Sequence, residues 1–97
     1  MLTSKQRTVL KGLASNIDPI GQIGKGGISE NQVQSFDQAL EKRELIKITV
    51  LENSMEDKRE LARELEKVLN AECVIVIGRK IVLYRKSNRK DINHIEI

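Results

Sequence analysis

A glycine-rich segment at residues 24–27 is the part of this sequence best suited to bind an anion. It reads Gly24-Lys25-Gly26-Gly27 and lies between a short apolar stretch and a pattern typical of a helix start. Glycine lacks a Cβ and tolerates positive φ, so a phosphate can approach the backbone closely. The first amides of a helix have no internal partners and favour an anion. Lys25 adds a cation, and G-x-x-G loops of this kind clamp the nucleic-acid backbone in KH modules.

The residues alone also allow other interpretations of this segment. A flexible connector that binds nothing fits them about as well, and a small enzyme that binds a phosphate ligand is a further alternative. A P-loop does not fit, because Gly26 follows Lys25 where Ser or Thr is required. A dinucleotide fingerprint does not fit either, because Ser29 stands in place of its third glycine.

The sequence contains no recognisable catalytic or metal-binding group of residues. The single histidine, His94, has no Cys or carboxylate cluster at ligand spacing, and the single cysteine, Cys73, opens an apolar stretch typical of a buried strand. We therefore expect no enzyme activity, no metal and no cofactor. Aromatic residues are only 2% of the chain, so rows of rings that stack on bases are not expected either.

Basic charge is concentrated at the two ends of the chain. Residues 1–29 carry four Lys or Arg against one acid, residues 30–72 seven against eleven, and residues 73–97 six against two. If the ends meet on one face, that face attracts phosphate; otherwise these are ordinary solvated charges. With 97 residues, one cysteine, no apolar stretch of membrane length and no secretory signal, the chain is expected to be one soluble, cytoplasmic domain.

Seven elements must position these residues. Capping boxes at Thr3/Gln6 and Ser29/Gln32 predict helices over about 4–15 and 30–43, and Ser54 predicts the cap of a third helix over about 55–70. Apolar or alternating patterns predict strands at 20–23, 45–51, 73–77 and 80–85, with a hairpin turn between the last two. The order helix-strand-helix-strand-helix-strand-strand predicts a two-layer α/β (α+β) fold with a four-stranded mixed sheet. We expect one domain over residues 1–86 and a C-terminal tail over residues 87–97.

Four motifs in order along the chain resemble the CRM domain (chloroplast RNA splicing and ribosome maturation), in particular the stand-alone bacterial YhbY-like group. The motifs are Lys5-Gln6 with Leu10-Lys11-Gly12-Leu13-Ala14; Gly24-Lys25-Gly26-Gly27-Ile28-Ser29; Glu44-Leu45-Ile46-Lys47-Ile48; and Val76 to Arg85. The resemblance implies a fold similar to the C-terminal domain of translation initiation factor three, with an added N-terminal helix. It also implies RNA binding and, in bacteria, an association with assembling large ribosomal subunits.

The resemblance implies that lysines of the first helix and residues of the glycine loop, at the positions that match the family motifs, bind RNA. Basic residues near the final hairpin are a possible extension of it, or else solubilising charges. The predicted set is Lys5, Lys11, Gly24, Lys25, Gly26 and Gly27, and the possible extension is Arg79, Lys80 and Arg85. The expected partner is ribosomal RNA of the pre-large subunit, with no membrane and no small-molecule substrate. The alternative is a protein-interaction module that docks on ribosomal proteins or an assembly GTPase through an acidic helix around residues 56–66.

Overall fold

The computed structural model describes residues 1–54 and 57–97. Its elements are α1 (Ser4–Ala14), β1 (Gly21–Ile23), α2 (Glu30–Arg43), β2 (Leu45–Val50), α3 (Lys58–Leu69), β3 (Glu72–Ile77) and β4 (Lys80–Tyr84). The strands form one sheet in the order β1-β2-β4-β3. β1 runs parallel to β2, whereas β4 is antiparallel to both of its neighbours. The predicted element order and mixed four-stranded sheet are therefore confirmed. No helix in the described part of the chain is long and apolar enough to cross a bilayer.

The helix starts follow local side-chain chemistry. Thr3 and Gln6 form the predicted capping box of α1, and Ser29 and Gln32 form that of α2. The third helix differs from the prediction, because its cap is Asp57 and not Ser54. The Asp57 carboxylate accepts hydrogen bonds from the amides of Arg59 and Glu60, which satisfies two of the free amides at the start of α3. The predicted start at residue 55 lies outside the described residues.

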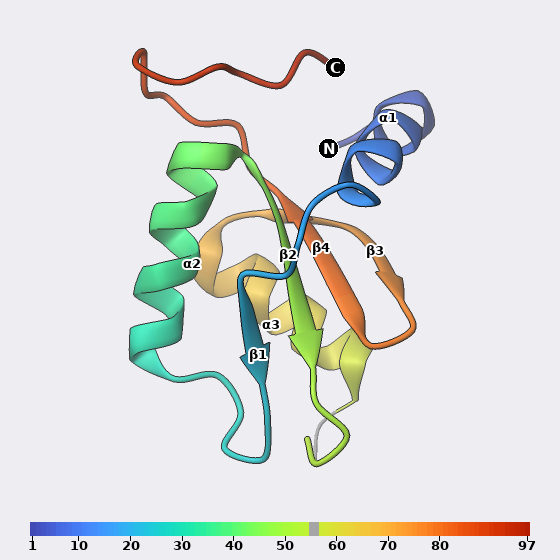
Figure 1. Ribbon diagram of the computed structural model, residues 1–97, viewed down its shortest axis with the longest axis vertical. Helices are drawn as coiled ribbons and strands as arrows, with labels where there is room; N and C mark the ends of the chain where they lie inside the picture. Colours follow the sequence, from blue (N-terminus) through green and yellow to red (C-terminus); the bar gives the residue numbers. More distant parts are fainter. Residues whose placement is uncertain (55–56) are drawn as a thin grey trace.

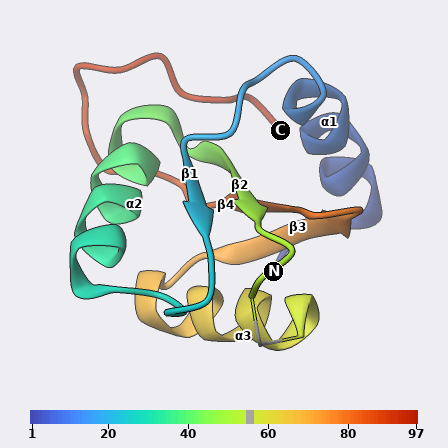
Figure 2. The same cartoon turned by 60° about the horizontal axis from the view of Figure 1, so that its bottom comes forward.

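One face of the sheet carries the main core. α2 and α3 pack on it through Phe36, Leu40, Leu61 and Leu65, which are at most 2% exposed. Figures 1 and 2 show α1 on the opposite side of the sheet from α3. There Leu10 and Ala14 pack in a second, smaller cluster together with Leu45, Val74, Val82 and Tyr84. The two expected layers, the sheet and the helices α2 and α3, are present. α1 adds a partial third layer that secondary-structure patterns alone did not predict.

The C-terminal tail (residues 87–97) forms no strand but is fixed to the domain at Glu44. This residue ends α2 in the left-handed conformation, with φ of 64°, and its side chain is 0% exposed. Its carboxylate accepts hydrogen bonds from the amides of Ser87 and Ile95, each at 2.7 Å, and lies 2.9 Å from Nδ1 of His94. The side chain of Ile95 packs on the small cluster beneath α1. Figure 1 shows the tail and α1 at the same end of the molecule.

Candidate nucleic-acid interface

The segment Gly24–Gly27 is a tight, exposed turn that continues β1. The Gly27 amide donates to the Gly24 carbonyl at 3.1 Å, and the two residues form an isolated bridge. Lys25 and Gly26 at the tip are exposed, and their amides donate no hydrogen bond to any described residue. Lys25 also forms no ion pair with the described residues. The tip therefore offers two backbone donors and one free ammonium group to an external anion.

The three glycines that flank or form the tip serve different purposes. Gly27 has φ of 73°, a conformation that side chains with a Cβ adopt at a cost. At Gly24, an added Cβ would lie 3.2 Å from Oδ1 of Asn53, so the neighbouring loop leaves little room. At Gly26, an added Cβ would meet nothing within 4 Å. The fold thus accounts for Gly24 and Gly27, whereas Gly26 leaves open space at the exposed tip.

The turn is anchored on both sides by hydrogen bonds. On the β1 side, the Leu51 amide donates to the Ile23 carbonyl at 2.8 Å. On the α2 side, the Gln32 side chain accepts from the Ser29 amide at 3.1 Å and donates to the Gln22 carbonyl at 2.5 Å. The capping box therefore occupies the Ser29 amide and, of the first-turn amides that were expected to help bind the anion, that of Gln32. The groups left at the tip are those of Lys25 and Gly26.

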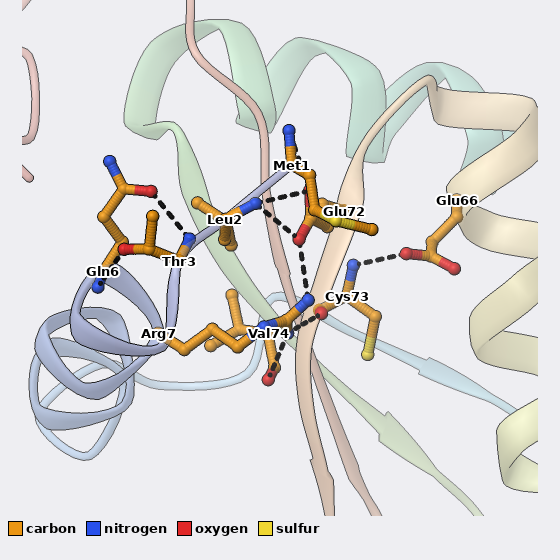
Figure 3. A network of polar contacts seen from close by, with 9 residues as sticks. All are labelled: Met1, Leu2, Thr3, Gln6, Arg7, Glu66, Glu72, Cys73 and Val74. Carbon is orange, nitrogen blue, oxygen red and sulfur yellow. Dashed lines mark hydrogen bonds and ion pairs between the residues drawn. The ribbon is translucent and has the colours of Figure 1, made fainter.

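A network of side-chain hydrogen bonds attaches α1 to β3, and Figure 3 shows it from close by. Nη1 of Arg7 donates to the carbonyls of Cys73 and Val74, at 2.7 and 3.0 Å, and Nη2 contacts Glu72 at 2.7 Å. Glu72 also accepts from the Leu2 amide at 2.9 Å. The first helix is therefore held at both its start and its buried face, and this fixes the direction in which its lysines project.

The predicted lysines of α1 project from this fixed helix. Lys5 and Lys11 are both exposed, and neither forms an ion pair with a described residue. The glycine turn, however, lies at the far end of β1 from α1 (Figure 1). The structure therefore does not bring Lys25 directly beside the first-helix lysines, and sheet surface separates them.

The three residues of the possible basic extension lie in different environments. Arg85 is only 15% exposed, and its guanidinium binds Asp37 and the Leu69 carbonyl, so it ties α2 to the end of α3. Arg79 forms an ion pair with Glu52. Lys80 is half-buried and unpaired among the described residues. Of the three, the structure favours an internal role for Arg85 and leaves the Lys80 ammonium available to a ligand.

Sequence reasoning did not select Lys47, which lies on β2 diagonally from Lys80. Thr49 pairs directly with Lys80, and Lys47 pairs with Val82, the next residue of β4 on the same face. Lys47 forms no ion pair with the described residues. The alternation of Lys47 and Thr49 with the apolar residues of β2 was the available signal. It showed that they share a face, but it could not show that this part of the face would stay uncovered.

Comparison with known proteins gives the family. The model of the CRS1 / YhbY (CRM) domain matches residues 2–85. The chain belongs to the CRM family. YqeI of Bacillus subtilis, named a probable RNA-binding protein, is 44% identical over 97 residues, which cover 100% of this chain and 99% of YqeI. A Haemophilus influenzae protein named RNA-binding protein is 34% identical over 91 residues, which cover 94% of this chain and 92% of that protein.

A solved structure shows the same fold. The solution structure of a Staphylococcus aureus protein superimposes with a TM-score of 0.78 at 53% sequence identity, and the match covers 98% of this chain and all of the other. The resemblance to the CRM domain predicted from four motifs is therefore confirmed. The CRM match includes both α1 and the glycine turn, so both parts of the candidate interface lie within the family domain.

Proposed function

We propose that this protein binds RNA without catalysing a reaction, and that its partner is ribosomal RNA during assembly of the large subunit. The exposed tip at Lys25 and Gly26 carries the proposal, because it combines unpaired amides with a free cation on an anchored turn. The names of the CRM relatives support RNA as the ligand. Assignment to the ribosome rests on the family resemblance, and the sucrose-gradient experiment below tests it.

In this mechanism the turn contacts the RNA backbone, and the lysines neutralise phosphates. Lys5, Lys11 and Lys25 are exposed cations without described partners, so binding does not require breaking internal ion pairs. Recognition follows RNA shape more than base sequence, because the only tyrosine and the only phenylalanine are both buried and offer no ring for stacking. Affinity falls steeply with salt, because each neutralised phosphate releases condensed counterion.

The first test compares the wild type with a Lys25→Glu, Gly26→Asp variant in two assays. In a sucrose gradient of cell lysate, the wild type should migrate with large-subunit precursors and the variant should move to the top. In a gel-shift assay with large-subunit ribosomal RNA, the variant should lose affinity. The matched control is Lys67→Glu, Asn70→Asp, which makes the same charge changes at exposed positions near the end of α3.

The outcomes separate the parts of the proposal. If the wild type binds ribosomal RNA but does not migrate with large-subunit precursors, the role in large-subunit assembly is wrong and RNA binding stands. A wild type that binds no RNA, or binding that barely changes between low and moderate salt, would overturn the mechanism. Equal loss in the control would show that net charge, and not the turn, governs binding.

The protein-interaction alternative predicts that α3 matters more than Lys25. The described part of this helix is less acidic than the sequence window suggested, because Lys58–Leu69 contains four basic and three acidic side chains. Charge reversal at Glu60 and Glu64, followed by pull-downs from lysate, tests this alternative. The phosphate-ligand enzyme is tested by thermal-shift measurements with a panel of nucleotides.

A further inference from the structure

Part of the sheet face on the α1 side is not covered by any described helix. α1 packs over the end of this face that contains Leu45, Val74 and Val82. Because side chains alternate along a strand and paired residues share a face, the strand register identifies the remaining positions. We call this surface the open sheet face, and it consists of Gln22, Lys47, Thr49, Ile77 and Lys80.

Gln22 and Ile77 of the open sheet face are exposed, whereas Lys47, Thr49 and Lys80 are half-buried. Ile77 is 60% exposed, although it lies directly opposite Lys80 in the β3–β4 pair. A shallow depression next to β1 is lined by Pro19, Ile20, Gly21, Gln22 and Thr49. The open sheet face thus combines cationic, hydrogen-bonding and apolar side chains.

The charge on this surface is entirely positive. Lys47 and Lys80 lie diagonally across β2 and β4, and neither has an acidic partner among the described residues. Glu72 of β3 lies on the same side of the sheet but at the end covered by α1. Its carboxylate accepts hydrogen bonds from Arg7 and from the Leu2 amide. Two lysines at neighbouring positions, without an ion-pair partner among the described residues, favour a polyanion over a neutral or basic partner.

The open sheet face runs into the glycine turn at one end, and α1 borders it at the other. Gln22 lies two residues before Gly24, so the surface runs directly into the glycine turn. On α1, Leu13 faces the tail, since it lines a cavity together with Ile95. Successive helix residues are rotated by about 100° around the axis, so Lys11, two residues before Leu13, is rotated by about 200° from it. Lys11 therefore projects from the opposite flank of α1, on the side turned away from the tail.

We propose that one RNA strand crosses the open sheet face between the glycine turn and Lys11, with Lys47 and Lys80 neutralising its phosphates. Gln22 and Thr49 are placed to hydrogen-bond ribose hydroxyl groups. The surface carries no aromatic ring, so the strand binds through its sugar–phosphate backbone. This inference rests on the proposed function, because it assigns a further contact surface for the same RNA.

The test uses the full chain and an in vitro transcript of large-subunit ribosomal RNA. We compare Lys47→Ala, Lys80→Ala with Lys42→Ala, Lys67→Ala, a control that removes the same charge from exposed helix positions of α2 and α3. The sheet variant should bind about tenfold more weakly or worse, and the slope of log affinity against log salt should flatten by between about one and two. The control should stay close to the wild type in both quantities.

A charge-preserving variant separates electrostatics from packing. Lys47→Arg, Lys80→Arg should keep near-wild-type affinity, since both phosphate contacts remain. Loss of binding in this variant would overturn the proposal. The proposal would also be overturned if Lys47→Ala, Lys80→Ala kept the affinity and the salt slope of the wild type while Lys25→Glu, Gly26→Asp had lost binding. In that case the proposed function would stand. If the wild type binds no RNA at all, the proposed function itself fails.

Discussion

Nδ1 of His94 lies 2.9 Å from Oε2 of Glu44, and the ring's Nε2 lies 2.6 Å from the Arg89 carbonyl. The Glu44 side chain is 0% exposed, so the imidazole meets a carboxylate that water does not reach. A protonated imidazole donates from both nitrogens and satisfies both acceptors at once. The contact therefore links the charge of His94 to the attachment of the tail.

This link predicts that the tail loosens as pH rises. The Glu44 hydrogen bond, together with that of the Arg89 carbonyl, raises the pKa of His94 above its ordinary value of about 6.5. Burial pushes the pKa of Glu44 up, but hydrogen bonds from His94, Ser87 and Ile95 outweigh it and leave the pKa below its ordinary value of about 4.3. The contact should be fully present between these two ordinary values, weaken as pH rises through the raised pKa of His94, and weaken as pH falls through the lowered pKa of Glu44.

NMR measures both parts of this prediction. The His94 ring should titrate above its ordinary pKa in the wild type and closer to it in Glu44→Gln. Relaxation of residues 92–97 should show more motion at pH 8.5 than at pH 6, and His94→Gln should remove most of that difference. A wild-type tail that is equally ordered at both pH values would contradict the role of the imidazolium.

Removing the Arg7 guanidinium should destabilise the protein. Arg7→Ala deletes three hydrogen bonds to β3 and leaves Glu72, only 25% exposed, without its main cation. We expect the free energy of unfolding to fall by about 1–3 kcal/mol. Urea unfolding measures the change, and Lys5→Ala, on the outer side of the same helix, should stay within about 0.5 kcal/mol of the wild type. Equal stability of the two variants would mean that the network does not hold α1.

Alanine substitutions in the glycine turn should separate stability from binding. Gly27→Ala places a Cβ at φ of 73° and should cost about 1–2 kcal/mol of unfolding free energy. Gly26→Ala meets open space and should leave stability within about 0.5 kcal/mol. Under the proposed mechanism, Gly26→Ala should nevertheless weaken RNA binding, since the methyl group stands where the phosphate approaches. Thermal melts and gel shifts on both variants check the two outcomes.

The Cys73 thiol should be chemically slow. Burial, reinforced by the neighbouring Glu66 carboxylate, raises the pKa of this thiol to about 11. At pH 8 the thiolate fraction is then on the order of a hundredfold smaller than for a free cysteine. Alkylation by iodoacetamide should be slower by at least this factor in the native protein and should recover in urea. Fast native alkylation would show that β3 opens readily.

Local patterns predicted most of the fold and only part of the candidate site. The caps at Thr3 and Ser29 depend on side chains three residues apart, so the sequence displays them directly. The binding of Glu44 to a tail about 50 residues away is non-local, and no periodicity signals it. For the same reason Arg85 looked like a free basic residue, although it binds Asp37 and the Leu69 carbonyl. The uncovered position of Lys47 depends on where α1 packs, which follows from tertiary contacts with β3.

The network around Arg7 also has a consequence for self-association. β3 lies at the edge of the sheet and contains a bulge between Cys73 and Ile75. Outward-facing backbone groups of an edge strand can pair with another chain. Here the Cys73 amide is bound by the Glu66 carboxylate at 2.8 Å, and the Cys73 and Val74 carbonyls are bound by Arg7 (Figure 3). Arg7 of α1 and Glu66 of α3 thus block strand addition at Cys73 and Val74. Removing the first helix would free the two carbonyls that Arg7 binds, so such a protein should be more prone to aggregate through β3.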